Sequence, residues 1–146
     1  MRVTYKGDYA LKALLDLAIH YEHGLLTIHD IAKHISAPVK FLEQVLLELK
    51  NGGFVESRRG KIGGYLLARA PGRITLGEAV RFIDGPIEPI ACVEKGYTGC
   101  TDIYKCVFRK IWLDMGRSAS EIVDHITFEE LANKVQVNTG ALVYQI

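Results

Sequence analysis

The sequence predicts a mainly α-helical protein with one small β-hairpin and a long helix in its C-terminal half. Two short amphipathic helical patterns flank a tight break at residues 36–38, and two short apolar strands around a glycine-rich loop follow them. Further along, a longer helical pattern is apolar on two sides. With 146 residues and 49% apolar residues, the chain suits one domain with a core. We therefore expect a winged helix-turn-helix domain with a small β-hairpin wing, plus a long dimerisation helix.

The first three helices are marked by their start and stop signals. Apolar residues at helical spacing predict a first helix over residues 8–21, and Gly24 ends it. Thr27 and Asp30 have the spacing of a capping box at the start of a short second helix. A third helix is predicted over residues 38–50, because proline is tolerated in a first turn and Asn-Gly-Gly follows.

The second and third helices together predict a helix-turn-helix, whose second member can lie in the major groove of DNA. An ordinary helical hairpin is the alternative. Residues 54–56 and 65–68 predict two strands, and the loop between them reads SRRGKIGG. That loop lacks the GxGxxG and GxxxxGK[ST] patterns of nucleotide phosphate loops. A basic hairpin directly after a helix-turn-helix is typical of a wing.

Candidate DNA contacts come from the third helix and the wing. Helical spacing turns Lys40, Glu43 and Gln44 outward, and these side chains can pair with guanine, cytosine and adenine respectively. In the wing, the candidates for phosphate or minor-groove contacts are Arg58, Arg59 and Lys61. Lysine and arginine exceed aspartate and glutamate in the first half of the chain, as binding to backbone phosphates requires.

The second half begins with a short helix and ends with another. Thr75 and Glu78 predict a capping box for a helix over residues 76–83, and Thr127 with Glu130 predicts one for a short helix over residues 128–135. Between them, the long helical pattern carries two apolar stripes, which favours packing on its own lobe and on the same helix of a second subunit, as a homodimer. The expected divisions are 1–83 for the DNA-binding domain, 84–101 for a cysteine-bearing loop, 102–126 for the dimerisation helix and 127–146 for a short helix and an irregular tail.

All three cysteines, Cys92, Cys100 and Cys106, lie in one short glycine-bearing segment. An odd number of cysteines in a reducing compartment argues against a disulfide framework. Thiolates select zinc, copper(I) or iron-sulfur clusters, and a fourth ligand must come from elsewhere. Structural zinc and thiol switching are the competing interpretations, since three thiolates plus one other ligand is a common zinc set.

The sequence resembles the winged-helix family of bacterial iron-sulfur transcription regulators that includes IscR and NsrR. The resemblance rests on MRVTYKGDYALKALLDLA, PVKFLEQVLLELKNGGFVESRRG, GGYLLARAP, ITLGEAVRFIDG, the three-cysteine loop and ITFEELANKV. It implies a homodimer that binds an inverted-repeat operator and holds an iron-sulfur cluster (2Fe-2S or 4Fe-4S) through three cysteines and one non-cysteine ligand. The signal, either cluster assembly or redox and nitric oxide stress, stays open.

The resemblance also bears on the fourth ligand. Arg109 stands where the IscR-type regulators carry a histidine ligand, and arginine cannot bind a metal. Asp8 matches the aspartate that the NsrR-type regulators supply from the first helix of the other subunit. Capping of the first helix is the alternative role for Asp8. The rival ligands are Glu88, Glu94, Asp102 and His125, whereas His20, His23, His29 and His34 are expected on solvated helix faces.

Several other classes of protein are disfavoured. No apolar run of about 18 residues could span a bilayer, and the N-terminus lacks a signal-peptide pattern, so a cytoplasmic protein is expected. No nucleophile, base or cofactor fingerprint converges, so no enzyme is predicted. A protein-interaction module without a cluster is the remaining alternative, and the helix-turn-helix and wing argue against a simple electron carrier.

Overall fold

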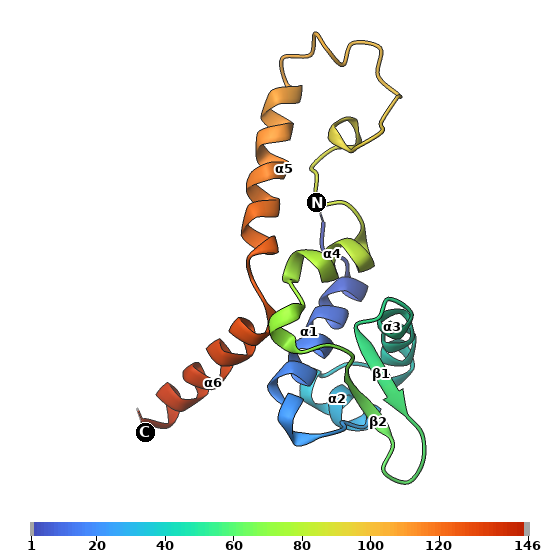
Figure 1. Cartoon of the computed structure of the whole chain (residues 1–146), viewed down its shortest axis with the longest axis vertical. Helices are drawn as coiled ribbons and strands as arrows, with labels where there is room; N and C mark the ends of the chain where they lie inside the picture. Colours follow the sequence, from blue (N-terminus) through green and yellow to red (C-terminus); the bar gives the residue numbers. More distant parts are fainter. Residues whose placement is uncertain (1, 145–146) are drawn as a thin grey trace.

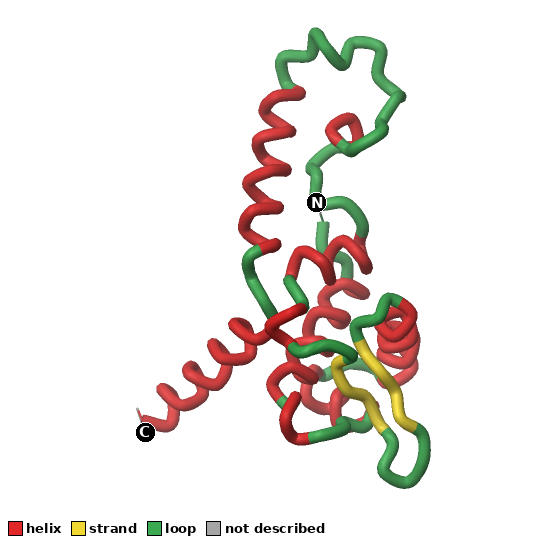
Figure 2. The backbone as a smooth tube through the Cα atoms, in the orientation of Figure 1, coloured by secondary structure: helices red, strands yellow, loops and turns green. Residues whose placement is uncertain are grey.

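The structure is a computed structural model that describes residues 2–144, with side chains described through residue 140. Within that part of the chain, helices dominate and one two-stranded hairpin stands beside them (Figures 1 and 2). The helices and strands are α1 (Tyr5–Ile19), α2 (Ile28–Ile35), α3 (Val39–Asn51), β1 (Val55–Arg58), β2 (Gly64–Leu67), α4 (Leu76–Asp84), α5 (Arg109–Asp124) and α6 (Phe128–Tyr144). Three short 3-10 turns are η1 (Tyr21–His23), η2 (Pro71–Arg73) and η3 (Ala91–Val93).

Helix α1 is the centre of the core, where it packs against α2, α3, α4 and α6. Its buried face carries small residues beside leucines, so neighbouring helices approach closely; Ala10, Ala13 and Leu14 are fully buried. Leu42, Leu46 and other apolar side chains of α3 close the same cluster. Burial of each such leucine contributes roughly 1.5–3 kcal/mol. This core fixes the lobe that presents the helix-turn-helix.

The predicted helix-turn-helix and wing are present. Thr27 and Asp30 exchange both hydrogen bonds of a capping box at the start of α2, and the hydrogen bonds from Thr27 lower the pKa of Asp30. Ser36 turns the chain in a left-handed conformation (φ 54°) before α3 begins. Strands β1 and β2 pair antiparallel, and Leu26 extends the hairpin by bridging to Tyr65.

The start of α1 differs from the expectation, because the helix begins three residues earlier. Thr4 is its N-cap and accepts a hydrogen bond from the Gly7 amide at 3.0 Å, so capping by Asp8 is wrong. Thr4 also donates from its amide and its hydroxyl to the carboxylate of Asp84, the last residue of α4. Gly7 packs so tightly against the same carboxylate that a Cβ atom there would collide with it. The N-terminus of α1 is therefore fastened to the end of α4.

Helix α5 is shorter than expected, because it begins at Arg109 and ends at Asp124. On one side, Trp112 is half-buried, while Gly116 is buried where Glu88 and Pro89 pass over it. Asp124 holds α5 to α4 through a bidentate ion pair with Arg81. The hydrogen bond from Arg81 lowers the pKa of Asp124, and the same bond raises the pKa of Arg81. The other side of α5 remains exposed, with Phe108, Ile111, Met115 and Ile122 all more than half accessible.

Helix α6 is longer than expected, because it continues through the stretch for which the sequence predicts an irregular tail. The predicted capping box of Thr127 and Glu130 is complete, with hydrogen bonds of 3.1 and 3.2 Å. Thr127 also bridges to Thr75, so α6 starts against the strand-like segment that precedes α4. Phe128 and Ala132 anchor α6 on α1, beyond which the helix extends away from the lobe (Figure 1). None of the described helices is both long and apolar enough to cross a bilayer.

Candidate nucleic-acid interface and cysteine loop

The outward face of α3 carries the predicted base-reading side chains. Lys40, Glu43 and Gln44 are exposed, and Leu47 and Lys50 continue the same face one and two turns later. The opposite face is buried in the core, so the helix is held along its length. An exposed helix face with cations and amide groups, on a rigid lobe, suits insertion into a major groove.

The wing lies beside this face. A hollow of about 380 Å³ separates α3 from the hairpin, and Glu43, Arg58 and Arg59 line it together. Lys50 crosses the hollow and donates a hydrogen bond from Nζ to the Ser57 hydroxyl at 2.8 Å. The structure thus brings three of the predicted residues, from two separate elements, to one basic surface.

The remaining wing residue, Lys61, is exposed in the turn between β1 and β2 and does not line this hollow. Its neighbour Ile62 is 87% exposed. Lys50, Ser57 and Tyr65 belong to the hollow but were not among the predicted DNA contacts. Helical spacing alone turns Lys50 outward; its proximity to Ser57 requires the folded hairpin.

The three cysteines lie in the long segment between α4 and α5. Cys92 is half-buried in η3, whereas Cys100 and Cys106 are exposed, and all three are free thiols. Gly96 takes a positive φ of 84°, which lets the loop bend between the first two cysteines. Figure 1 shows this loop as an arch above the ends of α4 and α5.

The three thiols of this loop do not form a three-ligand group among the described side chains. Two sulfur atoms on one zinc ion lie at most about 4.6 Å apart, twice a Zn–S bond. Among the side chains that the structure describes, only Asp16, His20 and His34 bring three ligand atoms within 4.8 Å of one another. No cysteine belongs to such a group among the described side chains, and a zinc ion and a cluster would each require the loop to draw the thiolates together.

Arg109 gives a second observation on the same loop. It stands three residues after Cys106, and its Nε atom is buried without a hydrogen-bond partner among the described residues. A buried donor without an acceptor costs about 1–3 kcal/mol. The three free thiols on this loop are the donor type that holds iron-sulfur clusters, so the residues present fit such a group.

Asp8, the predicted fourth ligand, lies half-buried in the first turn of α1. Its carboxylate pairs with Lys12 at 2.6 Å, and this hydrogen bond raises the pKa of Lys12. Both side chains are about half exposed, so solvent screens the pair and it contributes little to stability. Asp8 also borders a hollow of about 590 Å³ with Thr4 and Tyr5. It is thus accessible, and it belongs to the helix end that Thr4 fastens to α4.

The rival ligands differ in their surroundings. Glu94 is half-buried, Asp102 is exposed, and His125 donates a hydrogen bond from Nδ1 to the backbone oxygen of Glu121 at 2.7 Å. Glu88 lies against Gly116 of α5. None of these positions brings a ligand atom into a three-residue group with the cysteines among the described side chains.

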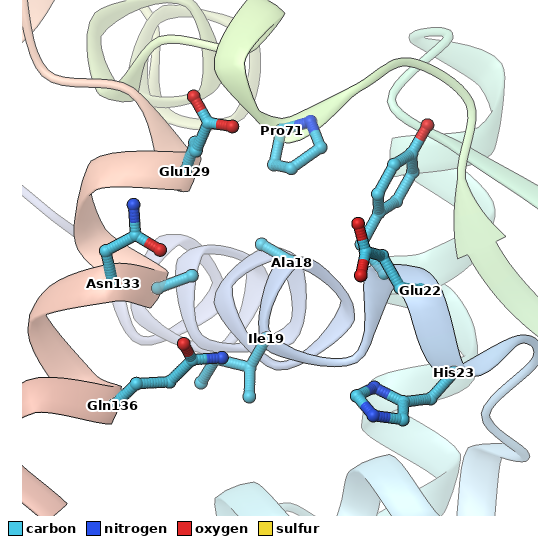
Figure 3. A pocket seen from close by; sticks show the side chains of 10 residues that line it. Ala18, Ile19, Glu22, His23, Pro71, Glu129, Asn133 and Gln136 are labelled. Atoms are coloured by element: carbon cyan, nitrogen blue, oxygen red, sulfur yellow. The ribbon is translucent and has the colours of Figure 1, made fainter. Parts of the chain in front are cut away.

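Another hollow, of about 220 Å³, lies where α6 meets the end of α1. Figure 3 shows Glu22, His23, Glu129 and Gln136 around it. None of the predicted DNA or metal residues lines it. The hollow therefore adds no candidate to either predicted site.

Comparisons with known proteins decide the family. The model of the Rrf2 family, described as an iron-dependent transcriptional regulator, matches residues 3–134. This chain belongs to the Rrf2 family. A putative rrf2-like HTH-type transcriptional regulator of Rhodobacter capsulatus is 40% identical over 136 residues, which cover 88% of this chain and 91% of the relative. The HTH-type transcriptional regulator IscR of Cronobacter sakazakii is 36% identical over 137 residues, covering 94% and 83%.

Solved structures agree with this assignment. The global cysteine regulator CymR of B. subtilis superposes with a TM-score of 0.77 at 30% identity, covering 92% of this chain and 98% of that one. IscR of T. potens gives a TM-score of 0.72 at 28% identity, covering 92% and 88%. The predicted winged-helix fold is thereby confirmed. The Rrf2 protein is a helix-turn-helix transcriptional regulator, and its predicted role as a DNA-binding protein is supported by these relatives.

Proposed function

We propose that this Rrf2 protein is a cytoplasmic homodimer whose binding to an inverted-repeat operator is controlled by an iron-sulfur cluster. One observation carries the proposal. Three free thiols lie on the single loop that joins the DNA-binding lobe to a helix with an exposed apolar face. A change in that loop acts on both the lobe and the dimer contact.

The dimer rests on the exposed side of α5. Phe108, Ile111, Met115 and Ile122 recur at the spacing of a near-heptad stripe, and each is 51–63% exposed. Contiguous apolar surface of this kind marks an interaction site. The stripe can face the same stripe of a second copy around a two-fold axis, because such an interface is self-complementary. We assign 102–126 to dimerisation and 1–83 to DNA binding on this basis.

Cys92, Cys100 and Cys106 are the proposed cysteine ligands, and Asp8 of the partner subunit is the proposed fourth ligand. When bound, the cluster supplies iron that exchanges electrons or reacts with nitric oxide and oxidants. Carboxylate is a harder donor than thiolate and binds cluster iron less tightly, which leaves that corner open to reaction. The relatives named IscR and the family's description as iron-dependent support iron as the metal.

The coupling from loop to DNA runs through α1 and α4. The loop begins at Gly85, immediately after Asp84, whose carboxylate holds the Thr4 cap of α1. Helix α1 in turn packs against α3, which carries the base-reading face. Two recognition helices must lie about one DNA turn apart to read both half-sites. A ligand from α1 of one subunit would bind the cluster of the other subunit more tightly in one arrangement of the two lobes than in another. Cluster loading would therefore shift the equilibrium between these arrangements and so change the spacing of the two recognition helices.

At the DNA, Lys40, Glu43 and Gln44 are proposed to read base edges in the major groove. Arg58, Arg59 and Lys61 are proposed to contact phosphates or the minor groove. The shared hollow between α3 and the wing supports a single continuous interface.

Replacing Asp8 by asparagine tests the fourth ligand. We expect anaerobically purified Asp8→Asn protein to lose or alter the visible absorption of the cluster, because a neutral amide is a poor substitute for the carboxylate. Lys12→Ala is the matched control, since it breaks the same ion pair but keeps the carboxylate. Identical spectra for Asp8→Asn and wild type would place the fourth ligand elsewhere.

Replacing Arg59 by alanine tests the wing. We expect weaker operator binding and a salt dependence whose slope falls by about 1, as the loss of one phosphate contact predicts. Lys110→Ala is the control for charge, because Lys110 is exposed on α5, away from the wing (Figure 1). Fluorescence anisotropy at several salt concentrations measures both quantities. Unchanged binding by the Arg59 variant would remove the wing from the interface.

A thiol-based regulator is the second candidate function. The exposed thiols of Cys100 and Cys106 and the likeness to the cysteine regulator CymR favour it. Iron analysis of anaerobically purified protein separates the two functions. A colourless, iron-free protein whose DNA binding changes with oxidant would support the thiol switch and contradict the cluster.

A further inference from the structure

Asp16, His20 and His34 form a cluster where the C-terminal ends of α1 and α2 meet, remote in sequence from the cysteine loop. The side chain of Asp16 is only 8% exposed. His34 donates from Nδ1 to both carboxylate oxygens, at 3.0 and 2.9 Å. The two imidazole rings stack with their centroids 5.2 Å apart and 16° between their planes. His34 is exposed, as the sequence predicts, whereas His20 is only partly exposed, and both rings have partners in this cluster.

The two rings each turn Nδ1 towards Asp16. His20 donates from Nδ1 to the backbone oxygen of Asp16 at 2.8 Å, and His34 uses Nδ1 for the carboxylate. Nδ1 of His34 lies 2.9 Å and Nδ1 of His20 lies 3.3 Å from the carboxylate oxygens of Asp16. In the tautomer with the proton on Nε2, each Nδ1 keeps a lone pair, so a cation bound between the two rings and the carboxylate replaces these hydrogen bonds.

The geometry also suits one ion. Each of the three residues offers a ligand atom, and these atoms lie within 4.8 Å of one another. Two nitrogens on one zinc ion lie at most about 4.2 Å apart, twice a Zn–N bond. Small side-chain rotations would close the difference. The histidine side chains are 33% and 40% exposed, so an ion can reach them from solvent.

We propose that Asp16, His20 and His34 bind a borderline divalent transition ion, represented by Zn²⁺, in addition to any centre on the cysteines. Two imidazoles and a carboxylate suit such ions. His23 lies beside His20, with ring centroids 6.2 Å apart, and water or His23 completes the coordination.

The site would act on the helix-turn-helix. Its ligands come from α1 and from the last turn of α2, directly before Ser36 turns the chain towards α3. An ion here fastens α2 to the central helix of the core. The consequence is a more rigid recognition lobe, whether or not the cysteine loop is loaded.

Zinc titration of a protein without cysteines tests the site. The background is the full chain carrying Cys92→Ser, Cys100→Ser and Cys106→Ser, because thiolates would otherwise compete for zinc. After removal of metal, calorimetric titration with Zn²⁺ is expected to show about one site per chain. Adding His34→Gln is expected to weaken zinc binding at least about 10-fold, the lower bound for loss of a supporting residue at metal sites.

Two controls keep the result specific. His29→Gln removes an exposed histidine of α2 outside the cluster and is expected to leave zinc affinity unchanged. His20→Gln tests the second helix independently, and circular dichroism of each metal-free variant confirms its fold. A cysteine-free parent that binds no zinc would overturn the proposal. Zinc affinity that neither His20→Gln nor His34→Gln reduces would overturn it as well.

Discussion

Replacing Ile111 on α5 by glutamate is expected to dissociate the proposed dimer of the Rrf2 protein into monomers and to weaken operator binding strongly. Ile111 belongs to the exposed apolar stripe, and a dimer carries the change twice. A carboxylate buried in an apolar interface without a partner is costly. We expect the dimer dissociation constant to rise at least about 100-fold, which corresponds to about 2.8 kcal/mol. Sedimentation equilibrium measures it directly.

The matched control is Arg117→Glu, which places the same carboxylate on an exposed position of α5 away from the stripe. This variant is expected to remain dimeric. Operator binding by both variants is then compared at one protein concentration, because each lobe alone contacts only one half-site. A dimeric Ile111→Glu protein would mean that another surface joins the subunits.

Replacing Cys100 by serine is expected to abolish stable loading of the iron-sulfur cluster. Cys100 is an exposed free thiol in the middle of the cysteine loop, and clusters are held mainly by thiolates. Loss of even a residue that only supports a metal ligand costs about 10–100-fold in metal affinity, so loss of a ligand itself should cost at least as much. Visible absorption and iron content of anaerobically purified protein measure the effect.

Thr101→Ser is the control for Cys100→Ser, because it alters the adjacent exposed position without touching a thiol. Its spectrum is expected to match that of wild type. Full iron content in the Cys100→Ser protein would exclude Cys100 as a ligand. DNA binding by the two variants shows whether cluster loading changes the affinity for the operator.

Local signals predicted the helix-turn-helix and wing well, because they depend on residues close in sequence. Thr27 and Asp30 make the expected capping box, and Thr127 and Glu130 make another. At Thr75 only half of the expected box forms, because the Glu78 carboxylate binds Arg69 instead of turning back to the cap. A tertiary ion pair decides that detail, and the sequence pattern does not contain it.

Apolar periodicity did not mark the boundaries of α5 and α6. Apolar periodicity continues from Tyr104 into α5, yet residues 101–107 form turns rather than the first turns of the helix. Helix α6 continues where periodicity fails, and Val137 there is 69% exposed. The part of α6 that extends beyond its contact with α1 needs no periodic apolar face, so the pattern gives no signal there.

Some residues of the candidate sites are predicted by a local sequence pattern, and others come together only when the helices pack. Outward spacing on α3 was enough to find Lys40, Glu43 and Gln44, which are all exposed. The Asp16 cluster was missed, although an aspartate four residues before His20 is a local signal for one of its contacts. The third member, His34, arrives from α2 only when the two helices pack. Pairing across elements is the part that one sequence read alone does not provide.

Trp112 is the single tryptophan of the chain, and it lies half-buried on α5 one helical turn before Gly116, the residue that packs against Glu88 and Pro89. Indole emission depends on the polarity around the ring. Fluorescence from this one position therefore reports movement of α5 relative to the lobe without any attached dye. The protein carries its own optical probe at the junction between its two halves.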